Sequence, residues 1–87
     1  MAFVYILKSL TFGKYYIGST NNFKRRFIQH NAGREKSTKW LKPFKLILVQ
    51  EYRTLSEARI IENKLKMFKS RKIIEKIIKE GVIKMTA

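Results

Sequence analysis

Residues 14–30, KYYIGSTNNFKRRFIQH, contain most of the side chains in this chain that could perform chemistry. Tyr16 offers a phenol from a strand-like segment, after which the period becomes helical and places Arg26 and His30 four residues apart. A second phenol, Tyr5, precedes this stretch. Phosphodiester cleavage needs a group that activates water, positive charge for the developing phosphorane and usually a metal ion. These four side chains suit the first two requirements.

A metal ion would have to be held by glutamate, because the chain contains neither aspartate nor cysteine. Glu62 is the preferred metal anchor, since it borders the apolar face of a predicted helix. A single carboxylate suits one hydrated Mg²⁺ or Mn²⁺ better than a two-metal cage. The alternative is that Glu62 is an exposed helix residue that pairs with Lys66, four positions further on.

Positive charge dominates the composition, with 20 Lys and Arg residues against 6 acidic residues and a net charge of +14 over 87 residues. Such a field attracts polyanions, so nucleic acid is the expected partner. Arg26 offers a planar fork of donors that matches phosphate oxygens. The other expected nucleic-acid contacts are Lys14, Lys24, Arg25, Lys36, Lys39, Trp40 and Lys66. Trp40 would stack on an unpaired base or fill the space under its loop.

The hydrophobic residues, 45% of the chain, are spread over short strand and helix periods, without a long apolar run or a secretory pattern. We therefore expect a soluble, cytoplasmic protein that does not bind membranes, although an anionic membrane surface would also satisfy the charge. The lack of cysteine fits a reducing compartment. Residues 1–87 are expected to form a single domain of modest core.

Three segments have the pattern of β-strands: residues 2–9, 14–20 and 44–52. The first two should form a hairpin around Gly13, and the third should pair with the first. If the hairpin closes just after residue 9, Tyr5 lies opposite Gly18, so that Tyr5 and Tyr16 share one face of the sheet.

Three helices are predicted from capping residues and apolar stripes. The first follows Asn21 or Asn22 and ends at Gly33, the second follows Thr54, and the third runs from Ser70 to Gly81. The predicted fold class is therefore α/β (α+β): a three-stranded antiparallel sheet in the order 2-1-3 with packed helices, in the sequence ββαβαα.

The triplet YIG at positions 16–18 and the triplet FVY at positions 3–5 resemble the two signature triplets of the GIY-YIG nuclease superfamily. The second triplet is complete, whereas the first keeps only the tyrosine. In size the chain resembles small stand-alone members related to the nuclease domain of the bacterial excision-repair incision protein. Five residues agree with the family in order and spacing: Tyr5, Tyr16, Arg26, His30 and Glu62.

The resemblance implies a metal-dependent endonuclease that cleaves DNA by attack of an activated water, in DNA repair, recombination or mobile-element processing. It implies that Tyr16 is the general base, that Tyr5 supports it by hydrogen bonding, and that His30 contacts substrate or relays a proton. The sequence alone does not rank the two tyrosines. We expect the hydroxyls of both tyrosines and the functional groups of Arg26, His30 and Glu62 to line one concave surface.

Other interpretations of these residues remain open from the sequence. A tyrosine in a strand commonly packs in the core with its hydroxyl satisfied, and a histidine near the end of a helix commonly interacts with the helix dipole. The same fold and charge would also suit a noncatalytic nucleic-acid-binding module. RNA is open as a substrate, and the oligomeric state is not readable from the sequence.

Overall fold

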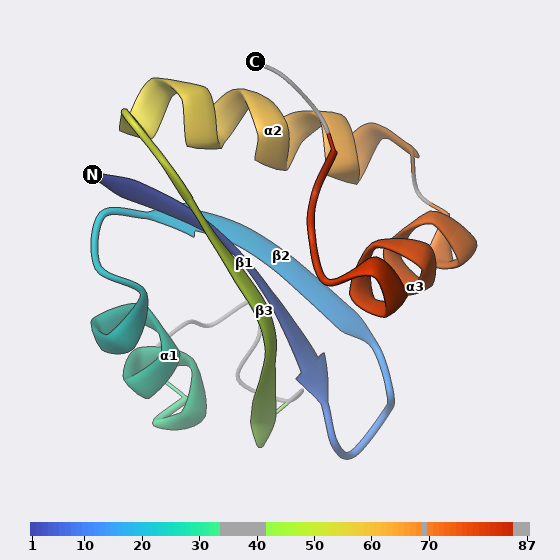
Figure 1. Ribbon diagram of the computed structural model, residues 1–87. Helices are drawn as coiled ribbons and strands as arrows, with labels where there is room; N and C mark the ends of the chain where they lie inside the picture. The colour runs from blue at the N-terminus through green and yellow to red at the C-terminus, as the bar shows by residue number, and fades with distance from the viewer. Residues whose placement is uncertain (34–41, 69, 85–87) are drawn as a thin grey trace.

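Six elements follow one another along the chain: β1 (Ala2–Ser9), β2 (Tyr15–Thr20), α1 (Phe23–Asn31), β3 (Phe44–Tyr52), α2 (Leu55–Phe68) and α3 (Arg71–Glu80). Figure 1 shows this computed structural model, which describes residues 1–33, 42–68 and 70–84. The strands form one antiparallel sheet in the order β2-β1-β3. The predicted α+β fold, its element sequence and its strand order are therefore confirmed.

The β1–β2 hairpin has the register that was predicted for it. The Ser9 backbone N–H donates to the Lys14 carbonyl at 2.8 Å, and Tyr5 pairs with Gly18 across the strands. Because side chains alternate between the two faces of a strand, Tyr16 lies on the same face as Tyr5.

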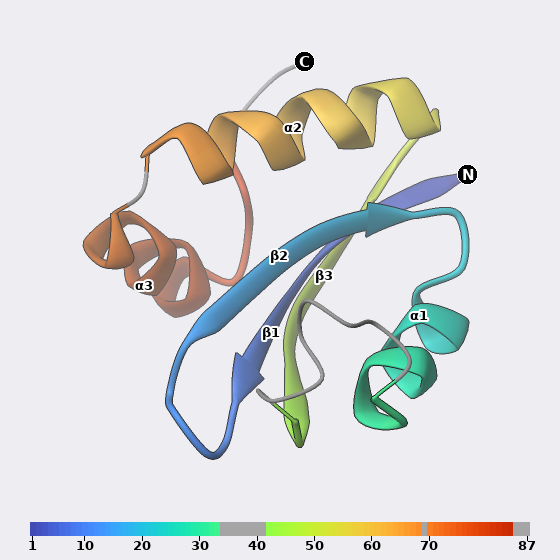
Figure 2. The ribbon, with the colours of Figure 1, turned by 180° about the vertical axis from the view of Figure 1, so that it is seen from behind.

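The two faces of the sheet are covered by different helices (Figures 1 and 2). Val4 and Ile6 of β1 pack with buried residues of α2 and α3 in the larger apolar core. Tyr5 and Leu7 point the other way and pack with Phe44 and with the partly buried rings of β2 and α1. Neighbouring residues of β1 are therefore buried in opposite layers, which explains why this strand shows little polar alternation.

The helices begin at the predicted capping residues. The Asn22 side chain accepts the Arg25 N–H at 3.1 Å, and the Thr54 hydroxyl accepts the Glu57 N–H at 3.2 Å. Ser70 caps α3 in the same way, and α3 ends where Gly81 adopts a φ of 75°. These caps satisfy backbone groups that the helix itself leaves without partners.

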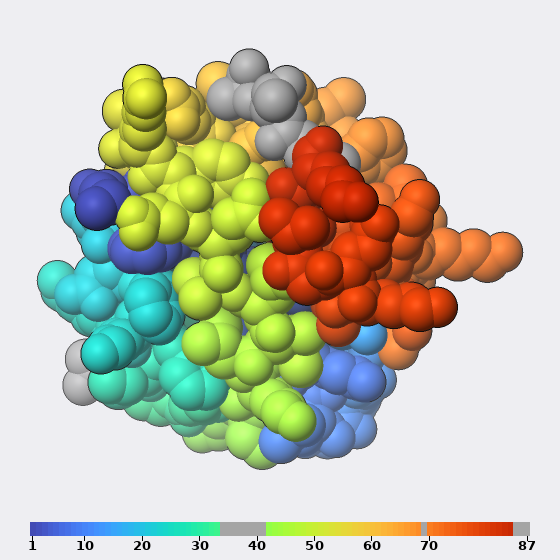
Figure 3. All heavy atoms as spheres, viewed as in Figure 1, coloured from blue at the N-terminus to red at the C-terminus, as the bar shows by residue number. Residues whose placement is uncertain are grey.

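Strand β3 lies at one edge of the sheet, and its side chains form the surface between α1 and α3 in the space-filling view (Figure 3). Strand β2 lies at the opposite edge, beside α2. Within the described part of the chain, none of the helices combines the length and the apolar character needed to cross a membrane.

Candidate active site

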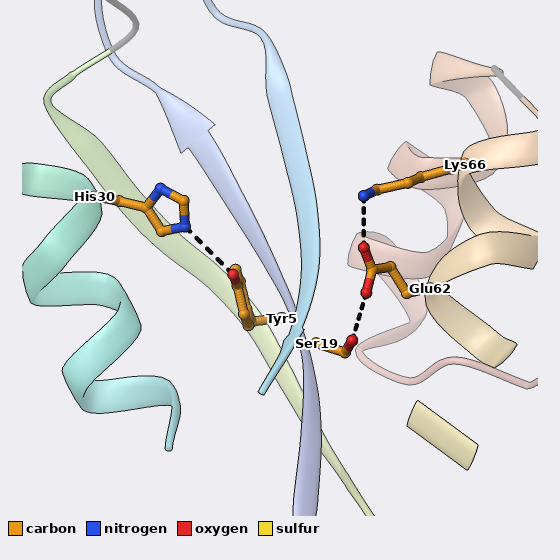
Figure 4. Close-up of polar contacts among 5 residues, drawn as sticks. All are labelled: Tyr5, Ser19, His30, Glu62 and Lys66. Carbon is orange, nitrogen blue, oxygen red and sulfur yellow. Dashed lines mark hydrogen bonds and ion pairs between the residues drawn. The ribbon is translucent and has the colours of Figure 1, made fainter. Parts of the chain in front are cut away.

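Tyr5 and His30 meet in the layer between the sheet and α1 (Figure 4). The Tyr5 hydroxyl lies 3.3 Å from His30 Nε2, and the two residues are only 2% and 0% exposed. The His30 ring also packs edge-on against the Tyr16 ring, with 4.7 Å between the centroids. This burial excludes direct contact between His30 and a substrate in this conformation, and it makes His30 a partner of the two tyrosines.

The surroundings of Tyr5 favour the neutral phenol. Burial raises the pKa of Tyr5 above its ordinary value of 10.0, and a side-chain hydrogen bond with Arg26 opposes this effect without cancelling it. The charge of Tyr16 raises the pKa further, the charge of Arg26 lowers it, and the charge of Glu62 raises it to a smaller extent. Near neutral pH the Tyr5 hydroxyl can therefore connect His30 with Arg26 as a neutral hydrogen-bonding group.

We expect the free energy of unfolding to depend on the ionisation of Tyr5 at alkaline pH. Because the pKa is raised in the folded protein, this contribution to stability is fully present below the pKa of a free phenol, about 10, and is lost as the pH rises beyond it. Tyr5→Phe should remove this part of the alkaline decrease in the free energy of unfolding. At neutral pH the substitution should lower the free energy of unfolding by about 1–2 kcal/mol, because buried hydrogen-bonding groups lose a partner. Urea unfolding of both proteins between neutral and alkaline pH measures the effect. An equal dependence of the free energy of unfolding on pH in the two proteins would contradict it.

Gly18 allows the Tyr5 ring to lie directly over β2. A Cβ atom at Gly18 would overlap the hydroxyl and ring carbons of Tyr5 and would lie 2.9 Å from its Cε2. The glycine of the YIG triplet therefore makes room for the first tyrosine, which is the close approach that an absent side chain permits.

Gly18→Ala should destabilise the fold by about 1–3 kcal/mol, the usual cost of forcing extra atoms into a packed site. The Tyr5 phenol would also move away from His30. Thermal or urea unfolding measures the loss, and the matched control is the same substitution in a Tyr5→Ala background, where the added methyl group has space. A cost that is equal in the two backgrounds would show that the Tyr5 contact is not its cause.

Arg26 lies on the flank of α1 that borders this layer. Its Nη1 donates to Gln29 Oε1 at 3.3 Å, and its side chain is half-buried. Arg26 and Gln29 also line a pocket of about 220 Å³, together with Arg25 and residues 20–22. Guanidinium and amide donors in one hollow suit a phosphate group.

Glu62 comes from α2 and approaches the opposite face of the sheet (Figure 4). Its carboxylate accepts a hydrogen bond from the Ser19 hydroxyl through Oε1. The Lys66 ammonium lies 2.5 Å from Oε2, and the Glu62 side chain is 16% exposed. Along β2, the side chains of Ser19 and Tyr16 point to opposite faces of the sheet. Glu62, which binds Ser19, therefore lies across the edge strand from the buried tyrosine layer.

The five candidate residues therefore do not line one concave surface, and that expectation was wrong. Tyr5 and His30 are buried, and Glu62 lies on the other side of β2. Alternation along β2 would have indicated this arrangement, since residues 15, 17 and 19 face the large core under α2. The two tyrosines, Arg26 and His30 are brought together, whereas Glu62 contacts Ser19 and Lys66.

Lys66 connects the two sides of this edge strand. Its Nζ lies 5.9 Å from the centroid of the Tyr16 ring while it pairs with Glu62. Tyr16 is half-buried, so one part of its ring packs on His30 and another part lies near the Lys66–Glu62 pair. Tyr16 is thus the tyrosine that lies close both to His30 and to the Lys66–Glu62 pair.

The donor set around Glu62 fits one divalent cation and no metal cage. Among the described residues no cluster of three or more His, Cys, Asp or Glu side chains could hold a metal ion. The partly exposed Glu62 carboxylate pairs with the Lys66 ammonium through Oε2 and is held by Ser19 through Oε1. A single carboxylate completed by water and substrate oxygens is an arrangement that Mg²⁺ accepts.

The predicted nucleic-acid contacts are only partly visible. Lys14, Lys24, Arg25 and Lys66 are exposed, as such contacts require. Lys36, Lys39 and Trp40 lie outside the described residues. Sequence reasoning missed Ser19, which binds Glu62, and Gln29, which binds Arg26. The sequence did carry a signal for both. Ser19 lies two residues after Ile17 on the same face of the strand, and Gln29 lies three residues after Arg26 on the same side of the helix.

Comparison with known proteins finds a matching family and similar bacterial proteins. Residues 1–76 match the family of the GIY-YIG catalytic domain. The UPF0213 protein of Streptococcus pneumoniae serotype 4 is 39% identical over 66 residues, which cover 75% of this chain and 66% of that protein. The UPF0213 protein of Staphylococcus saprophyticus is 35% identical over 80 residues, which cover 91% of this chain and 95% of that protein. The chain spans slightly less than two thirds of the pneumococcal relative.

No solved structure shows a significant match to this chain. The family match covers all six elements except the end of α3, and it includes the five candidate residues. A nuclease fold follows from this match. The chain belongs to the GIY-YIG family.

Proposed function

We propose that this protein is a metal-dependent endonuclease that cleaves DNA by attack of an activated water. One observation carries the proposal: Tyr16 packs against His30 on one side and lies near the Lys66–Glu62 pair on the other. A candidate base is thus close to a candidate cation anchor, and the family match supports a nuclease fold. The proposed setting is DNA repair, recombination or mobile-element processing in the cytoplasm, with residues 1–87 acting as one domain.

In the proposed mechanism each side chain except Lys66 acts from its observed position. Arg26, oriented by Gln29, binds the scissile phosphate and stabilises the charge that develops on it. Tyr16 acts as the general base, and its phenolate form accepts the proton of the attacking water to give the neutral phenol. Tyr5 and His30 hold the Tyr16 ring from behind by packing and by their own contact, so they act as positioning residues.

Glu62 would hold the divalent cation, Mg²⁺ or Mn²⁺, with Ser19 fixing one carboxylate oxygen. The bound cation would stabilise negative charge on the phosphate and the leaving oxygen. Lys66 would leave Oε2 to the cation and remain near the Tyr16 ring.

One observation favours a second function, that of a noncatalytic nucleic-acid-binding module. The Glu62 carboxylate is already neutralised by Lys66, as a purely structural ion pair would be. Incubation of the purified protein with single-stranded, duplex, flapped and branched DNA separates the two functions. We expect cleavage of at least one substrate with Mg²⁺ or Mn²⁺ and none with EDTA, whereas binding without cleavage under every condition would favour the second function.

Arg26→Ala should weaken both binding and cleavage, because the guanidinium contacts the phosphate before the reaction and stabilises added charge during it. We expect cleavage to fall about 10²-fold to 10³-fold and DNA affinity to fall several-fold. Arg59→Ala is the matched control, since Arg59 is an exposed arginine of α2. Equal effects of the two substitutions on single-turnover cleavage would refute the role of Arg26.

A further inference from the structure

A larger pocket, of about 410 Å³, lies between the start of β2, the end of α2 and the start of α3. Its volume is within the range of about 300–1,000 Å³ that is typical of small-ligand sites. Tyr16 and Lys66 line this pocket as well as the candidate active site, so the two sites adjoin. The mechanism above gives the rest of this pocket no role.

The floor of the pocket is apolar. Ile17, Leu65 and Ile74 line it, and each is buried in the core between the sheet and the two C-terminal helices. A floor formed by core side chains is rigid, because these residues are packed on all other sides. It suits a flat, largely apolar group that can be withdrawn from water.

The rim of the pocket is strongly basic. Lys14, Lys66 and Arg71 line it, and all three are exposed. The Arg71 guanidinium lies 5.0 Å from the centroid of the Tyr15 ring, and its Nη1 donates to the Gly13 carbonyl at 3.1 Å. A cation held in this way loses little freedom when it binds an anion.

Backbone donors add to this rim. Ser9 and Lys14 form a hydrogen-bonded pair of the antiparallel ladder, because the Ser9 N–H donates to the Lys14 carbonyl. Hydrogen-bonded and non-hydrogen-bonded pairs alternate along such a ladder, so Tyr15 and Ile17 belong to non-hydrogen-bonded pairs. The N–H groups of Tyr15 and Ile17 therefore point away from β1, toward the free edge of the sheet. Both residues line the pocket.

We propose that this pocket binds one unpaired nucleotide of the DNA strand that is cut, with its base on the apolar floor and its phosphate on the basic rim. The proposal rests on the nuclease function proposed above and specifies its substrate as DNA with an unpaired nucleotide beside the scissile phosphate. A base in a duplex would first have to be unpaired and unstacked to reach a recessed floor, whereas an unpaired base reaches it without that cost.

A base-removal scan tests this proposal in a binding assay with EDTA, where no cleavage is expected. Fluorescent single strands of about ten nucleotides, each with one abasic position, are titrated with the full chain. We expect one position at which loss of the base weakens binding about tenfold, with changes within about twofold elsewhere. A flat scan overturns the proposal.

The rim is tested by Arg71→Met, with Lys72→Met as the matched control. Lys72 is the next residue of α3, is exposed and does not line the pocket, so both variants lose one positive charge. Arg71→Met should weaken binding of the intact single strand about tenfold and Lys72→Met about twofold. Equal losses in two variants with parental circular dichroism spectra overturn the proposal.

The two proposals fail in different ways. A sensitive position in the scan without cleavage under any metal condition would support the pocket and remove the nuclease function. Cleavage of DNA together with a flat scan would support the nuclease and remove the pocket. Single-stranded DNA that is bound in the same way by Arg71→Met and by the parent would also remove the pocket.

Discussion

Glu62→Gln should reduce single-turnover DNA cleavage about 10³-fold while leaving the protein folded and its affinity for DNA unchanged or slightly higher. The amide keeps the shape of the side chain and an acceptor for Ser19 but loses the charge that would hold a divalent cation. Loss of one negative charge near the phosphates removes repulsion, which explains the slightly tighter binding. The partly exposed Lys66 pair contributes little to stability, at most about 1 kcal/mol.

Glu51→Gln is the matched control for this experiment, since Glu51 is an exposed glutamate of β3. Cleavage is measured at saturating protein with Mg²⁺ or Mn²⁺, and Mn²⁺ binding is measured separately by its effect on the melting temperature. Glu62→Gln should lose most of the metal-dependent stabilisation that the parent and the control retain. A Glu62→Gln protein that cuts at the parental rate with the same metal requirement would rule out the metal role of Glu62.

Tyr16→Phe should lower single-turnover cleavage about 10²-fold to 10⁴-fold, the range that general base catalysis supplies, with little change in binding. The substitution removes only the hydroxyl and keeps the ring that packs on His30. Tyr5→Phe should lower cleavage less, because Tyr5 is buried and acts on its neighbours rather than on water. The comparison therefore ranks the two tyrosines, which the sequence did not.

The control for the tyrosine variants is Tyr52→Phe, because the Tyr52 hydroxyl lies 3.0 Å from Gln50 on β3, away from the candidate site. This variant should cut at the parental rate. If Tyr5→Phe proves the more damaging of the two site variants, the assignment of the base to Tyr16 is reversed. Unchanged cleavage by Tyr16→Phe would remove the general base from the mechanism.

Most of the fold was predictable from local chemistry. Asn22, Thr54 and Ser70 cap the three helices because their side-chain oxygens satisfy backbone donors that no neighbouring turn can reach. The hairpin register followed from the four-residue loop, and it placed Tyr5 opposite Gly18 as expected. These features depend on residues close together in the sequence, so their prediction needed no knowledge of tertiary packing.

The family, the α+β fold, the shared face of the two tyrosines and the net charge of +14 could all be read from the amino-acid sequence. The three-dimensional packing was needed to show that His30 is buried behind the tyrosines, that Glu62 lies across β2 with Ser19 and Lys66, and that β2, α2 and α3 enclose a basic pocket. Strand and helix periods set the face on which a side chain lies along its own element. They do not set how α2 packs against the sheet edge, because that depends on contacts between residues far apart in the chain.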